Sequence, residues 1–125
     1  MNTPIDIKKK SVGWVIVFEF SWELDETNAD KTFTAVYNAI WDFTSKKLVF
    51  NFSWLKYLNS KSIWYIADIF SNIEDGNGQM FLTNMTEEVK DTLELVGITT
   101  IITTLDTEEE AFTALWVKLE DQKLA

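Results

Sequence analysis

The chain contains neither cysteine nor histidine. Without cysteine there can be no disulfide, thiol nucleophile or thiolate metal site, and without histidine the usual general base and the commonest zinc ligand are missing. The four glycines match neither dinucleotide-binding nor Walker spacing, so no phosphate-binding loop is expected. We therefore expect a protein that is not an enzyme, with no catalytic residues, no metal and no cofactor.

Positive charge is also scarce, because 11 Lys and Arg stand against 20 Asp and Glu for a net charge of −9. A surface this negative repels phosphate backbones and anionic membranes, so we expect no nucleic-acid partner. The apolar run at residues 12–20 is too short to span a bilayer, which predicts no direct membrane insertion. The expectation is a cytoplasmic protein.

A chain of 125 residues with 46% hydrophobic content is enough for one domain, which we place at 1–125. Runs rich in β-branched and aromatic residues predict strands at 12–20, 47–52, 79–83 and 99–104. Helical periodicity predicts helices at about 28–45, from Asn59–Ser60 to the turn at 75–78, from Thr86 to Gly97, and after Thr107. An additional strand around Ile5–Lys9 would pair antiparallel with residues 12–20.

Strands that alternate with helices indicate an α/β fold. We predict a four- to five-stranded, mostly parallel sheet with an antiparallel N-terminal edge strand and about four helices. The predicted inner faces of three helices are Phe33, Val36, Tyr37, Ile40 and Thr44; Ile63, Ile66, Ala67, Phe70 and Ile73; and Phe112, Leu115, Trp116 and Leu119. Thr27 or Asn28 is the expected N-cap of the first of these helices.

Acidic residues cluster after the first long predicted strand, at Glu23, Asp25 and Glu26. Such clusters are common in solvated loops and at helix starts, where negative charge is favoured. The alternative is a magnesium or partner-contact site. The acidic run at 106–110 is interpreted as helix capping, since Thr107 and Glu110 have capping-box spacing.

Asn59 is a good N-cap, which places Ser60 in the exposed first turn of the second predicted helix. A phosphate on Ser60 would lie where free backbone N–H groups and the helix dipole favour negative charge. The plain alternative is that serine and asparagine are simply frequent at helix caps.

Trp64 follows Ser60 by four residues and so shares its helix face, while the predicted buried stripe is offset from it. An exposed Trp64 beside a polar cap would form a protein-docking surface. A wider buried stripe would instead place Trp64 against a neighbouring helix. Both interpretations remain open from the sequence.

Four stretches, in this order, resemble the STAS domain family, shared by anti-sigma factor antagonists and sulfate-transporter tails. They are WELDETNAD (22–30), KLVFNFSWLKYLNSKSIWYI (47–66), EEVKDTLELVGITTII (87–102) and TEEEAF (107–112). Together they extend over nearly the whole chain. The resemblance implies a STAS-like fold and a regulatory protein-binding role.

In the antagonist branch of this family, a serine is phosphorylated by a partner anti-sigma kinase, and a serine phosphatase reverses the modification. That serine corresponds to Ser60, and the family's aspartate before it corresponds to Asn59. The following Ser/Thr and Gly positions are Lys61 and Ser62, and a further position that is often glycine is Trp64. The loop aspartate implicated in partner contact corresponds to Asp25, and the glycine before Glu-Leu-Asp to Trp22.

The resemblance therefore implies phosphorylation at Ser60 and a partner surface that includes Asp25, Asn59, Lys61, Ser62 and Trp64. The implied partners are an anti-sigma factor/serine kinase and a serine phosphatase, with the protein a bacterial transcription regulator that is a monomer or weak dimer. One alternative is a non-phosphorylated STAS subunit of a transporter-associated or other multiprotein complex. Another is a small enzyme, which the absence of His and Cys disfavours, or a carrier whose tryptophans line a pocket for an apolar ligand.

Overall fold

The structure is a computed structural model that describes residues 7–115. Its elements follow the order β1 (Ile7–Val12), β2 (Val15–Leu24), α1 (Ala29–Ile40), β3 (Lys47–Leu58), α2 (Ser60–Asp75), β4 (Gln79–Thr83), α3 (Glu87–Leu95), the 3₁₀ turn η1 (Ile98–Thr100), β5 (Thr104–Leu105) and α4 (Glu108–Ala114). None of the described helices is long and apolar enough to cross a membrane.

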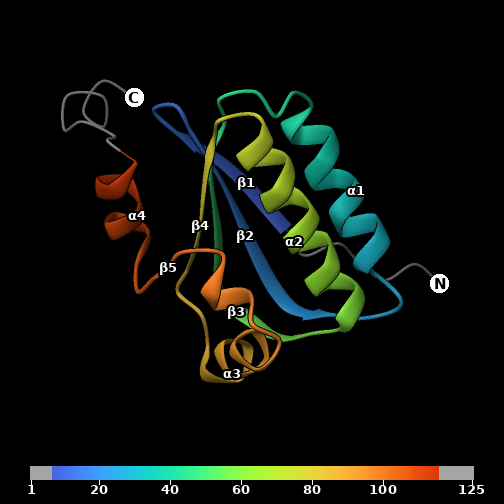
Figure 1. The fold of residues 1–125 in the computed structure, drawn as a ribbon. Coiled ribbons are helices and arrows are strands. Elements are labelled where there is room, and N and C mark those ends of the chain that lie inside the picture. Colours follow the sequence, from blue (N-terminus) through green and yellow to red (C-terminus); the bar gives the residue numbers. More distant parts are fainter. Residues whose placement is uncertain (1–6, 116–125) are drawn as a thin grey trace.

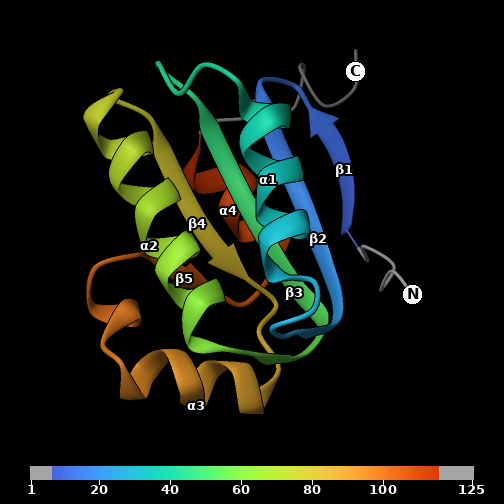
Figure 2. The ribbon, with the colours of Figure 1, turned by 90° about the vertical axis from the view of Figure 1, so that its right-hand side faces the viewer.

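The five strands form one sheet in the order β1-β2-β3-β4-β5. β1 is antiparallel to β2, and the other pairs are parallel. Helices α1 and α2 cover one face of the sheet, α4 lies on the opposite face, and α3 lies at the end where β3 finishes (Figures 1 and 2). The predicted mostly parallel sheet with an antiparallel N-terminal edge strand is confirmed.

Each face of the sheet has its own hydrophobic core. The larger core lies under α1 and α2, where alternate residues of β2 and β3 bring together Phe18, Phe20, Phe50 and Phe52. The ring centroids of Phe20 and Phe50 are 5.0 Å apart in an edge-on arrangement that aromatic pairs favour. On the other face, Ala111 and Leu115 pack on a smaller patch of valines from β2 and β3.

Several boundaries differ from the sequence expectation. The predicted strand start at Ile5 lies outside the described residues, and β2 and β3 extend further than expected, to Leu24 and Leu58. Helix α1 ends at Ile40 rather than near residue 45, because Trp41 has a positive φ of 62°. Thr44 therefore lies beyond the helix, where its backbone N–H donates to the Asp42 side chain.

The strand predicted at 99–104 is wrong for most of its length. Gly97, at φ 81°, ends α3 and directs the chain into the turn η1, and only Thr104–Leu105 pairs with β4. Ile98 and Ile102 are both buried, and the amide of Ile102 donates to the carbonyl of Ile98. A four-residue spacing of buried isoleucines fits a helical turn, although β-branched residues also favour strands.

The buried stripe of α2 is Ser62, Ile66, Ile69 and Ile73, which confirms the prediction at Ile66 and Ile73 and corrects it elsewhere. Ile63, Ala67 and Phe70 are only partly buried against the core. Thr107 accepts from the Glu110 amide at 3.2 Å, which confirms the predicted cap of α4. The positions predicted for this helix at Trp116 and Leu119 lie outside the described residues.

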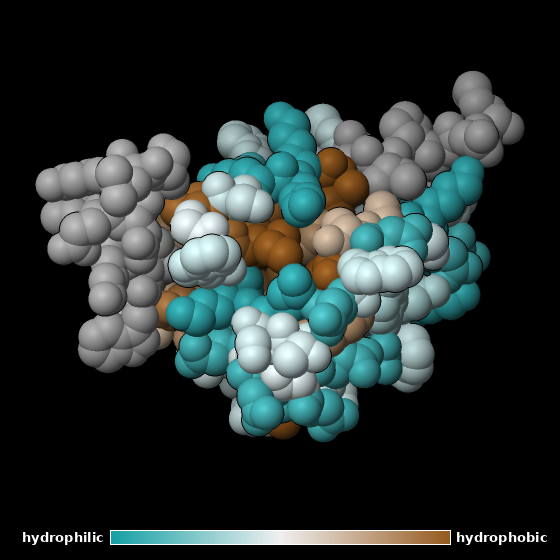
Figure 3. Space-filling model, turned by 90° about the horizontal axis from the view of Figure 1, so that it is seen from above, coloured by the Kyte–Doolittle hydropathy of each residue, from teal (hydrophilic) through white to brown (hydrophobic). Residues whose placement is uncertain are grey.

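Two tryptophans lie at the end of the sheet where the parallel strands begin. Trp14 is in the turn before β2 and Trp41 follows α1, and both are more than four-fifths exposed. Seen from this end, hydrophobic side chains gather in the middle, between hydrophilic ones (Figure 3).

Candidate functional site

The start of α2 is held by its N-cap. Asn59 has extended backbone angles, and its side-chain oxygen accepts from the Ser62 amide at 2.9 Å, which confirms the predicted cap. The Asn59 amide donates to the Leu24 carbonyl at 2.9 Å. This bond joins the beginning of α2 to the end of β2, so the Asp25 loop and the first turn of α2 lie at the same edge of the sheet.

Ser60 is the first residue of α2 and is exposed. The first turn of this 16-residue helix contains no acidic residue. Unsatisfied N–H groups and the positive end of the helix dipole therefore lie beside the Ser60 hydroxyl without a neighbouring carboxylate on the same turn. The position is chemically suited to carry a phosphate.

Lys61 is already paired. Its ammonium lies 2.9 Å from Asp30 Oδ1 and 3.0 Å from Oδ2, and the Tyr65 hydroxyl donates to Oδ1 at 2.5 Å. The Tyr65 hydrogen bond, followed by Lys61, lowers the pKa of Asp30, and Asp30 raises the pKa of Lys61. The pair is exposed and so contributes little stability, but it links the first turns of α1 and α2.

Trp64 is 61% exposed, so of the two open interpretations the structure favours a surface tryptophan. Its ring lies edge-on to Tyr65, with centroids 5.5 Å apart. Tyr65 in turn stacks on buried Phe33 at 4.9 Å. Trp64 is therefore the outer member of an aromatic group that is anchored in the core, which gives it a fixed support.

Ser62 does not fit the predicted partner surface. Its side chain is completely buried, and its hydroxyl has no hydrogen-bond partner among the described residues. Ser62 faces the sheet because it is part of the buried stripe of α2. In this conformation the Ser62 side chain is therefore not accessible to a partner.

Asp25 shapes the loop before α1. Its Oδ1 accepts from the Thr27 amide at 2.8 Å and from the Thr27 hydroxyl at 2.6 Å, and these bonds lower its pKa. Asn28 stands at the N-cap of α1, but its side chain instead donates to the Glu23 carbonyl and accepts from the Asp25 amide. Within residues 7–115, no three acidic side chains gather as a metal site.

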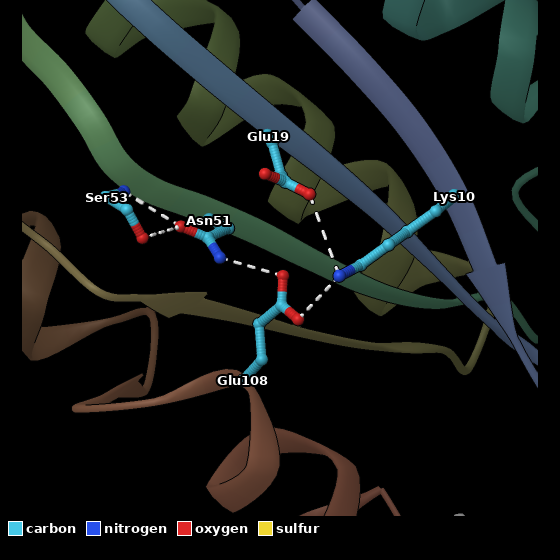
Figure 4. A network of polar contacts seen from close by, with 5 residues as sticks. All are labelled: Lys10, Glu19, Asn51, Ser53 and Glu108. Atoms are coloured by element: carbon cyan, nitrogen blue, oxygen red, sulfur yellow. Dashed lines mark hydrogen bonds and ion pairs between the residues drawn. The ribbon is translucent and has the colours of Figure 1, made fainter. Parts of the chain in front are cut away.

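A polar network that the sequence did not predict fastens α4 to the sheet (Figure 4). Glu108 accepts from Asn51 at 2.8 Å and lies 2.9 Å from the Lys10 ammonium, which is also 3.6 Å from Glu19. Asn51 accepts from both the amide and the hydroxyl of Ser53. The hydrogen bond that the Lys10 ammonium donates to Glu108 raises the pKa of Lys10. The sheet register brings Lys10, Glu19, Asn51 and Ser53 together, and the packing of α4 adds Glu108.

The STAS domain family matches residues 6–111, which is most of the chain. The chain therefore belongs to the STAS domain family. The match includes both parts of the site, the loop that contains Asp25 and the start of α2 at Ser60.

Solved structures similar to this chain share the fold. A putative anti-sigma factor antagonist from Thermotoga maritima has a TM-score of 0.78 at 24% identity, covering 87% of this chain and 93% of that one. The anti-sigma factor antagonist SpoIIAA, unphosphorylated, has a TM-score of 0.71 at 20% identity, covering 86% and 94%. SpoIIAA of Bacillus has also been solved in its phosphorylated form, which has a TM-score of 0.67 at 19% identity and covers 86% and 97%.

A membrane protein contains a similar domain. The murine anion transporter Slc26a9 has a TM-score of 0.73 at 16% identity, and the match covers 87% of this chain but only 19% of the transporter. The same fold thus occurs both in small regulators and as one part of a transporter.

Proposed function

We propose that this protein is a cytoplasmic regulator of the anti-sigma factor antagonist type, which acts by binding and not by catalysis. Its partner is an anti-sigma factor with serine kinase activity, and the phosphoryl acceptor is Ser60. A serine phosphatase restores the unmodified form. In this proposal the protein acts as a single domain over residues 1–125 and as a monomer or weak dimer.

The observation that carries this proposal is the exposed Ser60 at the capped start of α2. The Asn59 cap satisfies one first-turn amide, and the remaining donors favour an added dianion, so phosphorylation need not unfold the helix. Membership of the STAS family and the phosphorylated form of SpoIIAA support the assignment. The partner surface in this proposal includes Asp25, Asn59, Lys61 and Trp64.

Binding breaks when Ser60 is modified because two negative charges enter a surface that fits a neutral hydroxyl. Lys61 is engaged by Asp30, so it does not neutralise the added charge unless that ion pair opens. The uncompensated charge is then buried at the interface, which is costly. Phosphorylation therefore acts on the affinity for the partner and leaves the fold intact.

The experiment incubates the protein with its cognate kinase and maps the phosphopeptide by mass spectrometry. Ser60→Asp is then expected to weaken partner binding more than about tenfold, or about 1.4 kcal/mol. Ser71→Asp is the matched control, because Ser71 is also exposed on α2 but lies far from its N-terminus. Labelling at another residue, or equal affinity of Ser60→Asp and wild type, would contradict the switch.

A second candidate is a STAS subunit that docks constitutively in a transporter-associated or other multiprotein complex. Exposed Trp64, supported on Tyr65, favours it, since aromatic anchors of this kind dominate protein interfaces. In that case Trp64→Ala abolishes co-purification with a membrane complex, and phosphatase treatment has no effect. Phosphatase sensitivity of the complex would instead favour the switch.

A further inference from the structure

A hollow of about 370 Å³ lies near the C-terminal ends of β2 and β3, and two tryptophans and two lysines are among the residues that line it. The described lining residues are Lys8, Ser21, Trp22, Trp54 and Lys56. Trp54 precedes Leu55, which is in the core under α1 and α2, so Trp54 points to the other face of the sheet, and Lys56 lines the same hollow. Lys8 shares that face with Lys10, which binds Glu108 of α4.

Irregular backbone surrounds this hollow. The pairing of β2 with β3 shifts register between Glu19 and Ser21 and again between Trp22 and Glu23. Trp22 itself has a φ of 66°, a conformation that a bulky residue rarely adopts. Bulges of this kind change the direction in which side chains point, and strained backbone conformations are frequent at binding sites. The family resemblance assigns a glycine to position 22, so this chain keeps a glycine-like backbone but carries an indole on it.

The hollow combines positively charged ammonium groups with aromatic rings. The Lys56 ammonium lies 5.2 Å from the centroid of the Trp22 ring, a cation–π contact that positions its charge. Trp54 is 69% exposed, and among the described residues no ring or cation packs against it. None of the described lining residues is acidic, although the whole chain has a net charge of −9.

We propose that this hollow binds a small, flat aromatic molecule that carries a carboxylate. Its ring stacks on the free face of Trp54, while its carboxylate pairs with Lys56 and Lys8. The volume lies within the range of small-molecule sites, and a few placed polar groups among aromatic ones are their usual lining. The described lining includes none of the residues of the proposed partner surface, and the site goes beyond the proposed regulatory function because it needs neither the kinase nor a phosphate.

Three probes separate the two features of this ligand. 2-Naphthoate is flat and anionic, 2-naphthamide is flat and neutral, and decanoate is anionic but not flat. Calorimetric titration into the full chain is expected to show saturable, sub-millimolar binding of 2-naphthoate. The other two probes are expected to bind about tenfold more weakly, which corresponds to 1.4 kcal/mol each. Amide chemical shifts should change at the ends of β2 and β3.

Matched variants locate the site. Trp54→Ala and Lys56→Ala are each expected to weaken 2-naphthoate binding about tenfold, the size of one lost stacking or charge contact. Trp41→Ala and Lys90→Ala are the controls, since both residues are exposed and neither is among the described lining residues of the hollow. Trp54→Phe should retain most of the binding, because phenylalanine keeps a ring on which the ligand stacks.

Four results would overturn the proposal. They are the absence of saturable 2-naphthoate binding at millimolar concentration, equal binding of all three probes, unchanged affinity in folded Trp54→Ala, and shift changes confined to the end with Trp14 and Trp41. The chemical-shift map is made on the wild-type protein, so the test stands even where a variant fails to fold.

Discussion

Trp22 shows how a single residue departs from what its local backbone favours. A φ of 66° is readily adopted by glycine, while a side chain with a Cβ is strained there. Trp22 is 59% exposed, so burial returns only part of that cost. The Trp22 ring lies beneath the Lys56 ammonium, so Trp22 contributes more to the proposed ligand site than to the stability of the fold.

Glycine and alanine substitutions at Trp22 and Trp54, two residues that line the hollow, measure this backbone strain. We expect Trp22→Gly to be more stable than Trp22→Ala by about 1 kcal/mol, because only glycine relaxes at positive φ. At Trp54, which is not among the residues with positive φ, the order reverses, and glycine is less stable by about 0.5–1 kcal/mol. Urea unfolding of the four variants gives both differences. The same order at both positions would argue that Trp22 is unstrained.

Residue-scale prediction from the sequence succeeded where the signal is local. The Asn59 cap and the Thr107 cap depend on one side chain and an amide three residues later, and both are present. The burial of Ser62 and the contact of Lys56 with Trp22 were not predicted. Both depend on how α2 rotates on the sheet and on two register shifts, which no helical or alternating period encodes.

At the scale of elements, α4 is the shortest α-helix described, with 7 residues. Its buried residues in the core are Ala111 and, just after the helix, Leu115. A helix this short is only marginally stable alone, so tertiary contacts hold it in place. Glu108, whose side chain is 12% exposed, supplies the polar part of those contacts through Lys10 and Asn51.

Glu108→Ala is expected to destabilise the protein by about 1–2 kcal/mol, because it leaves the amide of buried Asn51 without its acceptor and removes the nearer of the two carboxylates that Lys10 contacts. Hydrogen exchange of the α4 amides should become faster, while exchange in α1 and α2 should not change. Glu109→Ala is the matched control, since Glu109 occupies the same turn but is exposed. Equal effects of the two substitutions would mean that helix capping charge, and not the network, holds α4.

The helices and strands were predicted best where an apolar pattern repeats over many residues. The order of strands and helices was correct, because stretches such as β3 and α2 carry a clear apolar pattern over many residues. The error at 99–104 arose in a short β-branched stretch, where Gly97 and the spacing of Ile98 and Ile102 favoured a turn. Short elements depend on the packing of the whole fold, so their local sequence does not decide between strand and turn.

At the scale of the whole molecule, the charge is strongly unbalanced, with 20 acidic residues against 11 basic ones. This excess repels itself in the compact state near neutral pH, which opposes folding. Individual carboxylates that accept hydrogen bonds in the folded state instead favour folding. Hydrogen bonds lower the pKa of Asp25 through Thr27, of Asp30 through Tyr65 and Lys61, and of Asp42 through Thr44.

These lowered pKa values set the sign of the acid dependence. A carboxyl group whose pKa is lower in the folded state contributes stability that is fully present above its ordinary value of 3.8. That contribution is lost as the pH falls through the folded-state pKa. We therefore expect the free energy of unfolding to fall below about pH 4. Acidification that stays above that point should change it less, because the contribution of these carboxylates is still fully present there.

Asp30→Asn isolates one contributor to this dependence. The amide cannot form the ion pair with Lys61 and has no carboxyl group to titrate, so the unfolding free energy of this variant should fall less steeply below about pH 4 than that of the wild type. Urea unfolding at a series of pH values measures both slopes. Asp91→Asn on α3 removes the same charge from an exposed position and is expected to retain the wild-type slope. Identical slopes for Asp30→Asn and Asp91→Asn would show that net charge alone governs the acid response, and that the link between the first turns of α1 and α2 contributes nothing to it.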